Sequence, residues 1–231
     1  MAAAPMTSVP NHRGWILWQK LLYAASLLAI WMSFSTAQIT MEVVPPNPIE
    51  GMDVLLLVHN LTWGDSVKFW YVSESLKSVP QLVVFVNLKN KSYPGPAYND
   101  RQTIYHNGSM LIRNINRKDT GFYSFQVLRN FSEEQQITML VPVYYGPDTP
   151  TMSSSSSYYR SGTPIKLSCH ATSNPPAQYS WWINGRPLGS TEELFIPSLS
   201  VNESGYYTCS AYNHVTGFYG YTIKTIKVFR K

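Results

Sequence analysis

One seven-residue frame occurs twice in this chain and constrains the fold more than any other feature. The two copies read Asp119-Thr-Gly-Phe-Tyr123-Ser-Phe125 and Glu203-Ser-Gly-Tyr-Tyr207-Thr-Cys209. Each has an acid, a glycine two residues later, a tyrosine four residues later and a residue typical of buried positions six residues later. A repeat of this length predicts two copies of one structural unit in tandem.

Residues upstream of each copy extend the match. Cys169 lies twelve residues before Trp181, and Val58 lies twelve residues before Trp70. A cysteine on one strand, a tryptophan on the next and a Tyr-x-Cys sequence on a later strand form the framework of the immunoglobulin sandwich. The chain is therefore predicted to be all-β, with two tandem immunoglobulin-like sandwiches.

The spacing within each framework separates two types of sandwich. Trp70 and Phe125 are 55 residues apart, whereas Trp181 and Cys209 are only 28 apart. A variable-type sandwich adds strands C′ and C″ in this interval. The first domain is therefore predicted to be variable-type. The second has no room for these strands and is predicted to be constant-like or intermediate.

Residues 1–37 have the pattern of a secretory signal peptide. Arg13 and Lys20 precede the apolar run 21–31, and Ser35 and Ala37 are small residues at the −3 and −1 positions. We expect cleavage after Ala37, because the apolar run is short for a membrane span. An uncleaved signal anchor is the alternative.

Removal of residues 1–37 leaves 194 residues, which suits two sandwiches of about 100 residues each. We expect the first domain at 38–145 and the second at 146–231. The two basic residues of the leader are removed with it, so the formal net charge falls from +5 to +3. Such a small charge, without a cluster of Lys and Arg, argues against nucleic acid binding.

Cysteine usage differs between the domains. The two cysteines of a secreted chain most simply form one disulfide, Cys169–Cys209. Closing a loop of about 40 residues contributes about 4 kcal/mol on the chain-entropy model. In the first domain Val58 and Phe125 occupy the two cysteine places, and we expect them to fill that volume with apolar contacts.

Other framework positions have structural predictions. Tyr123 and Tyr207 should form tyrosine corners, in which the phenol bonds upstream backbone. Arg101 and Asp119 have the spacing of the ion pair that closes one end of a variable-type sandwich. The proline-rich segment 93–98 lacks N–H donors for a ladder and is predicted to be a turn or loop.

Five Asn-x-Ser/Thr acceptors predict substantial N-glycosylation. They are Asn60, Asn90, Asn107, Asn130 and Asn202. The chain stops at Arg230-Lys231 without an apolar segment that could form a membrane span or a lipid-anchor signal. The expected mature product is a secreted, extracellular glycoprotein without a membrane span.

Catalysis, cofactors and metals have no support in the sequence. Asp119-Thr-Gly reproduces the catalytic triplet of aspartic proteases, but those enzymes need two such carboxylates and only one is present. The sandwich frame already explains it. His59 and His170 occupy matching places after one strand of each domain, which indicates a structural position and not a zinc site.

Exposed apolar residues favour a partner-binding surface. Because Trp70 should point inward, Phe69 and Tyr71 should point outward on one sheet face. Between the inward residues of the later strand, Gln126 and Leu128 should join that face, together with a glutamine, Gln81, from the next strand. Ordinary sheet surface, or contact with the neighbouring domain, is the alternative interpretation.

Longer motifs resemble one known family. Three in the first domain look like the N domain of carcinoembryonic antigen-related cell adhesion molecules: Val54-Leu-Leu-Leu-Val-His-Asn60, Pro94-Gly-Pro-Ala-Tyr98 and Asp119-Thr-Gly-Phe-Tyr123. Further motifs look like that family's B-type domain: Tyr145-Gly-Pro-Asp148, Leu167-Ser-Cys-His170, Ser173-Asn-Pro-Pro-Ala-Gln-Tyr-Ser-Trp181 and Glu193-Leu-Phe-Ile-Pro197. The resemblance covers essentially the whole chain.

The family also contains the secreted pregnancy-specific glycoproteins, and its N domain lacks the sandwich disulfide. The resemblance implies that the face of strands C, C′, F and G binds partners. It also implies that Tyr71, Gln81, Gln126 and Leu128 match residues of that face. The chain departs from adhesion members at Ser66, where they have phenylalanine, and in a short F–G loop that carries an acceptor. It also lacks an Arg-Gly-Asp tripeptide.

Together these features predict a secreted, glycosylated binding protein that modulates immune or cell-adhesion signalling. Its partners would be cell-surface proteins, including family members or other immune receptors, or a second copy in a weak homodimer. The second domain is interpreted as a spacer. The alternative is a homophilic or heterophilic adhesion molecule whose membrane anchor is missing from this isoform.

Overall fold

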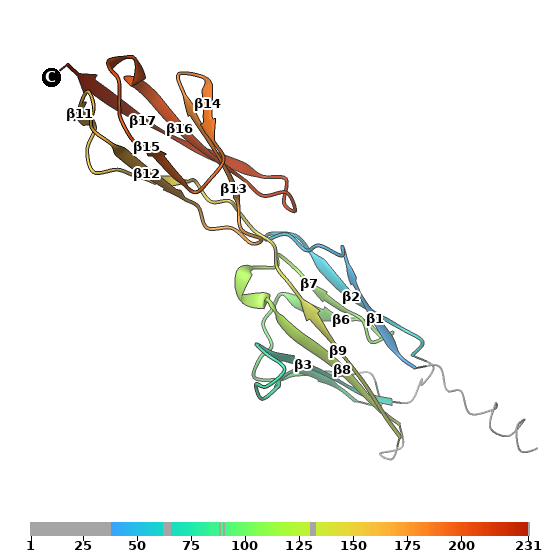
Figure 1. The fold of residues 1–231 in the computed structure, drawn as a ribbon. Coiled ribbons are helices and arrows are strands. Elements are labelled where there is room, and N and C mark those ends of the chain that lie inside the picture. Colours follow the sequence, from blue (N-terminus) through green and yellow to red (C-terminus); the bar gives the residue numbers. More distant parts are fainter. Residues whose placement is uncertain (1–37, 62–65, 88, 90, 130–132, 231) are drawn as a thin grey trace, which may run out of the picture. The chain divides into compact units, whose positions relative to one another are not determined.

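The computed structural model describes residues 38–61, 66–87, 89, 91–129 and 133–230. The predicted signal peptide and the acceptors Asn90 and Asn130 lie outside these residues. Within them, the chain is all-β apart from two short 3₁₀ turns (Figure 1). No helix in the described part is long and apolar enough to cross a membrane.

Two antiparallel sheets form the first sandwich. One has the order β1-β2-β7-β6 and the other the order β5-β4-β3-β8-β9. The strands are β1 (Thr40–Val44), β2 (Val54–His59), β3 (Ser66–Ser73), β4 (Gln81–Val86), β5 (Ser92–Pro94), β6 (Gln102–Ile104), β7 (Met110–Ile112), β8 (Gly121–Arg129) and β9 (Glu133–Val141). A 3₁₀ turn, η1 (Arg117–Asp119), precedes β8.

The second sandwich has sheets of order β10-β12-β15 and β11-β17-β16-β13-β14. Its strands are β10 (Thr151–Ser153), β11 (Tyr158–Arg160), β12 (Ile165–His170), β13 (Gln178–Ile183), β14 (Arg186–Gly189), β15 (Glu193–Ile196), β16 (Gly205–Tyr212) and β17 (Tyr219–Phe229). A matching turn, η2 (Val201–Glu203), precedes β16. The predicted fold class, two tandem immunoglobulin-like sandwiches with a disulfide only in the second, is confirmed.

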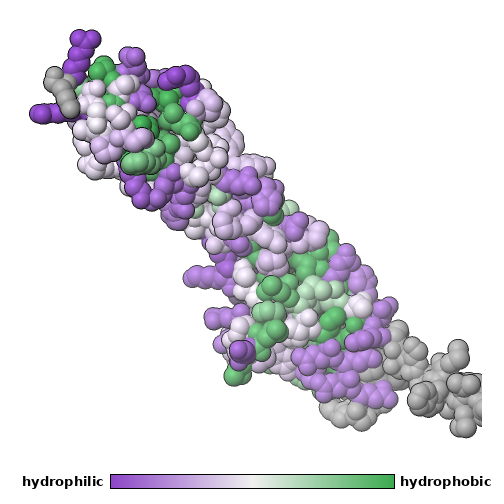
Figure 2. All heavy atoms as spheres, viewed as in Figure 1, coloured by the Kyte–Doolittle hydropathy of each residue, from purple (hydrophilic) through white to green (hydrophobic). Residues whose placement is uncertain are grey.

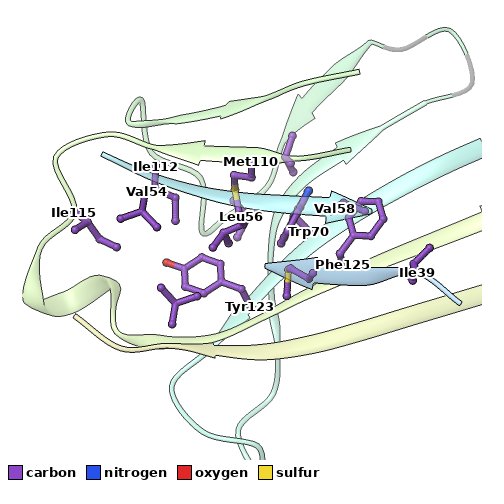
Figure 3. Packing of buried hydrophobic residues seen from close by; sticks show 14 of the residues in the cluster. Ile39, Val54, Leu56, Val58, Trp70, Met110, Ile112, Ile115, Tyr123 and Phe125 are labelled. Atoms are coloured by element: carbon purple, nitrogen blue, oxygen red, sulfur yellow. The ribbon is translucent and has the colours of Figure 1, made fainter. Parts of the chain in front are cut away.

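Apolar packing of Val58 on one sheet with Phe125 and Trp70 on the other takes the place of the disulfide in the first sandwich. The ring centroids of Trp70 and Phe125 are 5.1 Å apart, and both residues are fully buried. Figure 3 shows Val58 beside them, between the two sheets. The Trp70 indole Nε1 donates to the carbonyl of Gly108 at 2.9 Å. The predicted apolar replacement is therefore a packed contact anchored by one buried hydrogen bond.

Gly108 is required at the position it occupies. Its φ is +86°, a region that L-residues with side chains rarely adopt. A Cβ at Gly108 would lie 2.9 Å from the Phe125 ring. The same turn therefore supplies the Trp70 acceptor and leaves room for Phe125.

The second sandwich is centred on the Cys169–Cys209 disulfide and Trp181, all of which are fully buried. The indole Nε1 of Trp181 donates to the carbonyl of Thr191 at 2.8 Å. Each core thus has one buried tryptophan at the equivalent position. The sheets are joined by apolar packing in the first sandwich and by a disulfide in the second.

The repeated frame has one physical explanation in both domains. The Tyr123 hydroxyl donates to the carbonyl of Asp119 at 3.1 Å, and the Tyr207 hydroxyl donates to the carbonyl of Glu203 at 3.0 Å. Each acid also accepts, through its carboxylate, the N–H of the residue three positions earlier. The acid therefore closes the 3₁₀ turn while its own carbonyl holds the tyrosine, so both predicted tyrosine corners are confirmed.

The glycine of the frame starts the strand against a neighbour. A Cβ on Gly121 would lie 2.8 Å from the backbone oxygen of Ser73. A Cβ on Gly205, whose φ is +153°, would lie 2.2 Å from the Asn184 side chain. A side chain at Gly121 would push β8 away from β3, and one at Gly205 would displace the Asn184 side chain that bonds the backbone of Ser204 and Tyr206.

Asp119 has a second role in the first domain. Arg101 donates to both of its carboxylate oxygens, at 2.7 and 2.6 Å, and the carboxylate is buried. The hydrogen bond to Asp119 raises the pKa of Arg101. Arg101 also donates to the carbonyl of Asn114 at 3.0 Å, so this pair joins two loops at one end of the sandwich.

The histidines that match between domains contact acids on adjacent segments. His59 lies 3.1 Å from a carboxylate oxygen of Glu42, and His170 lies 3.2 Å from one of Glu192. Among the described residues, no group of three or more His, Cys, Asp or Glu side chains is arranged to hold a metal.

Two details of the prediction were wrong. The second domain does have room for a strand C′, because β14 pairs with β13 through a two-residue turn in which Asn184 and Gly185 both have positive φ. The segment 93–98 is not entirely loop either. Tyr93 and Pro94 belong to β5, which is an edge strand and can therefore tolerate proline.

Replacing Phe125 with alanine should test the apolar substitute for the disulfide. Phe125→Ala leaves a cavity beside Trp70 and should lower the free energy of unfolding by about 3–5 kcal/mol. Chemical denaturation followed by tryptophan fluorescence measures this loss. The control is Phe122→Ala on the opposite side of the same strand, where the ring is only half-buried. Equal losses in the two variants would contradict the assignment.

Alkaline pH should destabilise the second sandwich through its tyrosine corner. Burial, followed by the charge of Glu203, raises the pKa of Tyr207 from 10.0 to about 12. Below pH 10 the phenol is neutral in both states. Between these two pKa values it ionises mainly in the unfolded chain, so stability falls as pH rises through that window.

In the variant Tyr207→Phe the free energy of unfolding, measured by urea denaturation, should therefore fall less steeply as pH rises through that window. At neutral pH it should lose about 0.5–1.5 kcal/mol, because one hydrogen bond is removed. Tyr206→Phe, at an exposed neighbouring position, serves as the control and should retain the decline of the parent chain. If both variants keep the same decline, Tyr207 is not its source.

Candidate partner-binding face

The register of β3 and β8 determines which side chains share the outer face of the first sandwich. Trp70 pairs with Phe125 toward the core, so Phe69 pairs with Gln126 on the other side of the sheet. Val67 and Leu128 form the next outward pair. Four residues from the predicted set, Phe69, Tyr71, Gln126 and Leu128, thus occupy outward positions of two adjacent strands.

Four aromatic rings form a continuous ladder across β3, β4 and β5. The Tyr71 and Phe69 ring centroids are 6.1 Å apart, those of Phe69 and Phe85 are 5.1 Å apart, and those of Phe85 and Tyr93 are 5.7 Å apart. These separations lie in the range of favourable aromatic pairs. We call these four residues the aromatic ladder. It gives the face a rigid apolar surface at little cost in side-chain entropy.

A shallow apolar groove follows the ladder on one side. Its lining is formed by Val67, Phe69, Leu82, Phe85, Asn87, Lys89, Lys91, Tyr93, Pro94 and Leu128. Asn87 accepts backbone N–H bonds from Lys89 and Lys91 and orders this rim. Figure 2 shows apolar residues (green) exposed among polar ones (purple) on one side of the molecule.

Charges of opposite sign border the ladder. Lys89 and Lys91 line the groove near β5, whereas Glu134 lies on β9 and accepts a 2.7 Å hydrogen bond from Gln126. Partial burial, and then the charge of Glu134, raise the pKa of Tyr71. The Tyr71 phenol is therefore neutral at physiological pH and can donate or accept a hydrogen bond.

A β-bulge separates Gln81 from the other predicted residues. Val83 is the extra residue between the Trp70–Val84 and Tyr71–Leu82 pairs. Leu82 is consequently opposite Tyr71, and Gln81 pairs with Val72, a residue that packs against the core. Gln81 therefore begins the strand at the margin of the face.

Sequence reasoning missed Phe85, Tyr93 and Glu134. Phe85 could have been found by pairing 81–86 with the preceding strand, but the bulge shifts that register by one residue. Tyr93 was missed because the prolines that follow it predict a loop and not a strand. Glu134 lies four residues beyond the acceptor Asn130 and before Ile137, where the alternating pattern of the last strand begins.

Three glycosylation acceptors are described, and all are exposed. Asn60 follows β2, and Asn107 lies in the turn between β6 and β7, so both belong to the sheet opposite the aromatic ladder. Asn202 lies in η2 of the second domain. Glycans at Asn60 and Asn107 would leave the ladder uncovered.

Comparisons with known families agree with this architecture. Residues 45–144 match the immunoglobulin V-set domain, and residues 149–228 match an immunoglobulin domain model. The chain is built from two immunoglobulin-superfamily domains. Immunoglobulin-domain proteins generally bind or adhere and do not catalyse reactions.

Several solved structures are similar to this chain. The crystal structure of murine CEACAM1b is 25% identical with a TM-score of 0.57, and the match covers 83% of this chain and 100% of that one. An amphioxus IgVJ-C2 molecule is 21% identical with a TM-score of 0.60, over 78% of this chain and 99% of that one. The N-terminal four Ig domains of Dscam1 isoform 7.44 are 20% identical with a TM-score of 0.55, over 79% of this chain and 42% of that one. The fold is therefore CEACAM-like.

Proposed function

We propose that this chain is a secreted, glycosylated binding protein of the immunoglobulin superfamily. Its variable-type domain would recognise cell-surface proteins, either members of its own family or other immune receptors, through the outer face of β5-β4-β3-β8-β9. By occupying those proteins it would modulate immune or cell-adhesion signalling. The aromatic ladder is the observation that carries this proposal.

The composition of the face supports protein recognition. Tyrosine and phenylalanine are enriched at protein interfaces, and a few such residues usually supply most of the binding energy. Phe85 stands at the centre of the ladder, with Phe69 on one side and Tyr93 on the other. A partner that covers this centre would exclude water from three rings at once.

The bordering charges support selectivity. Lysines on one side and Glu134 on the other favour a partner with the opposite arrangement and disfavour a partner that would bring like charges together. The likeness to murine CEACAM1b supports a partner at the cell surface. The resemblance of the sequence motifs to carcinoembryonic antigen-related cell adhesion molecules supports the same face as the site of partner binding.

The test uses the glycosylated chain, secreted from mammalian cells and fluorescently labelled. It is applied to a panel of cells that each display one surface protein, including this chain itself with an added anchor. Phe85→Ala and Tyr71→Ala should each weaken binding to the recognised protein by about tenfold or more, as expected for central interface aromatics. Flow cytometry over a range of concentrations measures the change.

Tyr105→Ala is the matched control, because Tyr105 is an exposed aromatic that follows β6 of the opposite sheet. Its binding should equal that of the parent chain. Binding that survives both ladder variants, or that Tyr105→Ala removes, would place the contact elsewhere. Binding only to the displayed copy of this chain would favour the alternative function, a homophilic adhesion molecule.

The acceptor at Asn130 gives an additional test of the same face. Asn130 lies between β8 and β9, next to the strands that carry Gln126 and Glu134. A glycan there would stand at the edge of the face and limit close approach by a flat partner. Asn130→Gln should therefore strengthen ladder-dependent binding in the same assay, and Asn60→Gln, on the opposite sheet, should leave it unchanged.

A further inference from the structure

The second sandwich carries an extended aromatic face of its own. On the sheet β11-β17-β16-β13-β14, six large side chains are exposed by between 39% and 71%. They are Trp182, Tyr206, Tyr212, Tyr219, Tyr221 and Ile223, and we call them the Tyr/Trp face. All six alternate with less exposed residues along their strands, so they point to the same side of the sheet.

The register brings these residues into adjacent rows. Tyr212 pairs with Tyr219 across β16 and β17, and Tyr206 pairs with Thr225. Trp182 and Ile223 both lie opposite Thr208, one on each neighbouring strand. The rings therefore surround smaller hydroxyl residues and form one continuous surface.

No charged side chain interrupts the centre of this face. The remaining outward positions of β13 and β16, and those of β17 from Tyr219 to Thr225, carry only Gln178, Ser180, Thr208, Ser210 and Thr225. The opposite sheet differs, because Lys166 pairs with Glu193 at 2.8 Å on its surface. Solvated ion pairs are typical of free surface, whereas tyrosine and tryptophan without charge are typical of the centre of an interface.

We propose that the Tyr/Trp face binds the same face of a second copy of this chain. The uncharged centre of this face offers nothing to attract a strongly acidic or basic partner. Two copies of a chain with a positive net charge can meet here without bringing central like charges together. Tyrosine, serine and threonine hydroxyls each donate and accept, so the face is complementary to itself, as a two-fold interface requires.

The order of residues along β17 fits this arrangement. Its outward side chains run from Tyr219 and Tyr221 at one end to Lys227 at the other. A two-fold axis across the strands lays β17 antiparallel on its copy, so each lysine meets the tyrosine end and not a second lysine. Lys227 already lies 6.0 Å from the ring centroid of Tyr158, which shows that its ammonium group can approach an aromatic face.

Sheet-on-sheet contact also suits the shape of the surface. Two sheets pack face to face at about 10 Å, with rings from each side interdigitating. The small pair Ser180 and Ser210 lies beside Tyr221, and it leaves space on the face for a tyrosine of the second copy. The second domain would then be an association module and not only a spacer.

Analytical ultracentrifugation of the glycosylated mature chain tests the proposal. Over concentrations up to about 0.1 mM the chain should show a reversible monomer–dimer equilibrium. Tyr221→Asp and Ile223→Asp each place a charge at the centre of the interface and should raise the dimer dissociation constant by about tenfold or more. Phe195→Asp is the matched control, because Phe195 is 63% exposed on β15 of the opposite sheet, and it should leave the dimer unchanged.

A second variant blocks the face with a glycan and does not introduce a buried charge. Tyr206→Asn creates an Asn-Tyr-Thr acceptor at an exposed position, and the added glycan should prevent dimerisation while the chain is still secreted. Tyr71→Asp, on the first domain, separates this proposal from the proposed ladder interaction and should leave the dimer intact. A chain that stays monomeric, or a dimer that survives Tyr221→Asp or is lost with Tyr71→Asp, would overturn the proposal.

Discussion

A fully buried tryptophan packed in the core between the two sheets is the constraint on which each half of this chain depends. Trp70 meets Phe125 in the first sandwich, and Trp181 lies beside the Cys169–Cys209 disulfide in the second. Each indole is also fixed by a hydrogen bond to a loop carbonyl. Because a one-residue slip would turn each buried ring to the solvent face, the strands that carry them keep one register, and every outward side chain is positioned by that register.

The ends of the sandwiches are held by the repeated acid–tyrosine frame. One acidic residue closes the 3₁₀ turn with its carboxylate and anchors the tyrosine with its carbonyl. In the first domain Asp119 also forms an ion pair with Arg101. The domain without a disulfide thus has an additional polar contact at this end. The domain that is proposed to bind partners is thus held together by packing and hydrogen bonds, without a covalent link between its sheets.

Both proposed surfaces lie on equivalent sheets but differ in character. The face of the first domain combines four aromatic rings with lysines at one side and a glutamate at the other, which suits discrimination among different partners. The face of the second domain is aromatic and hydroxyl-rich without central charge, which suits self-recognition. One fold can therefore present two kinds of surface through the alternate residues of its strands.

The sequence by itself determined the fold class, the disulfide, both tyrosine corners and the outward direction of Phe69 and Tyr71. These follow from fixed spacings and from the two-residue period of a strand, which are local properties of a chain. The partners of those residues across the sheet were harder to predict, because the one-residue bulge at Val83 places Leu82 opposite Tyr71 and pairs Gln81 with Val72, which packs against the core. A bulge arises from packing between strands and has no signature in the order of residues.

Only the tertiary structure decided which side chains form a surface. Phe85 and Tyr93 join Phe69 because the three consecutive strands β3, β4 and β5 pair side by side in one sheet with a particular register. In the second domain Trp182 and Ile223 lie on either side of Thr208 for the same reason. Periodicity tells which way a residue points, whereas neighbourhood depends on strand order, and strand order is set by the packing of the whole sandwich.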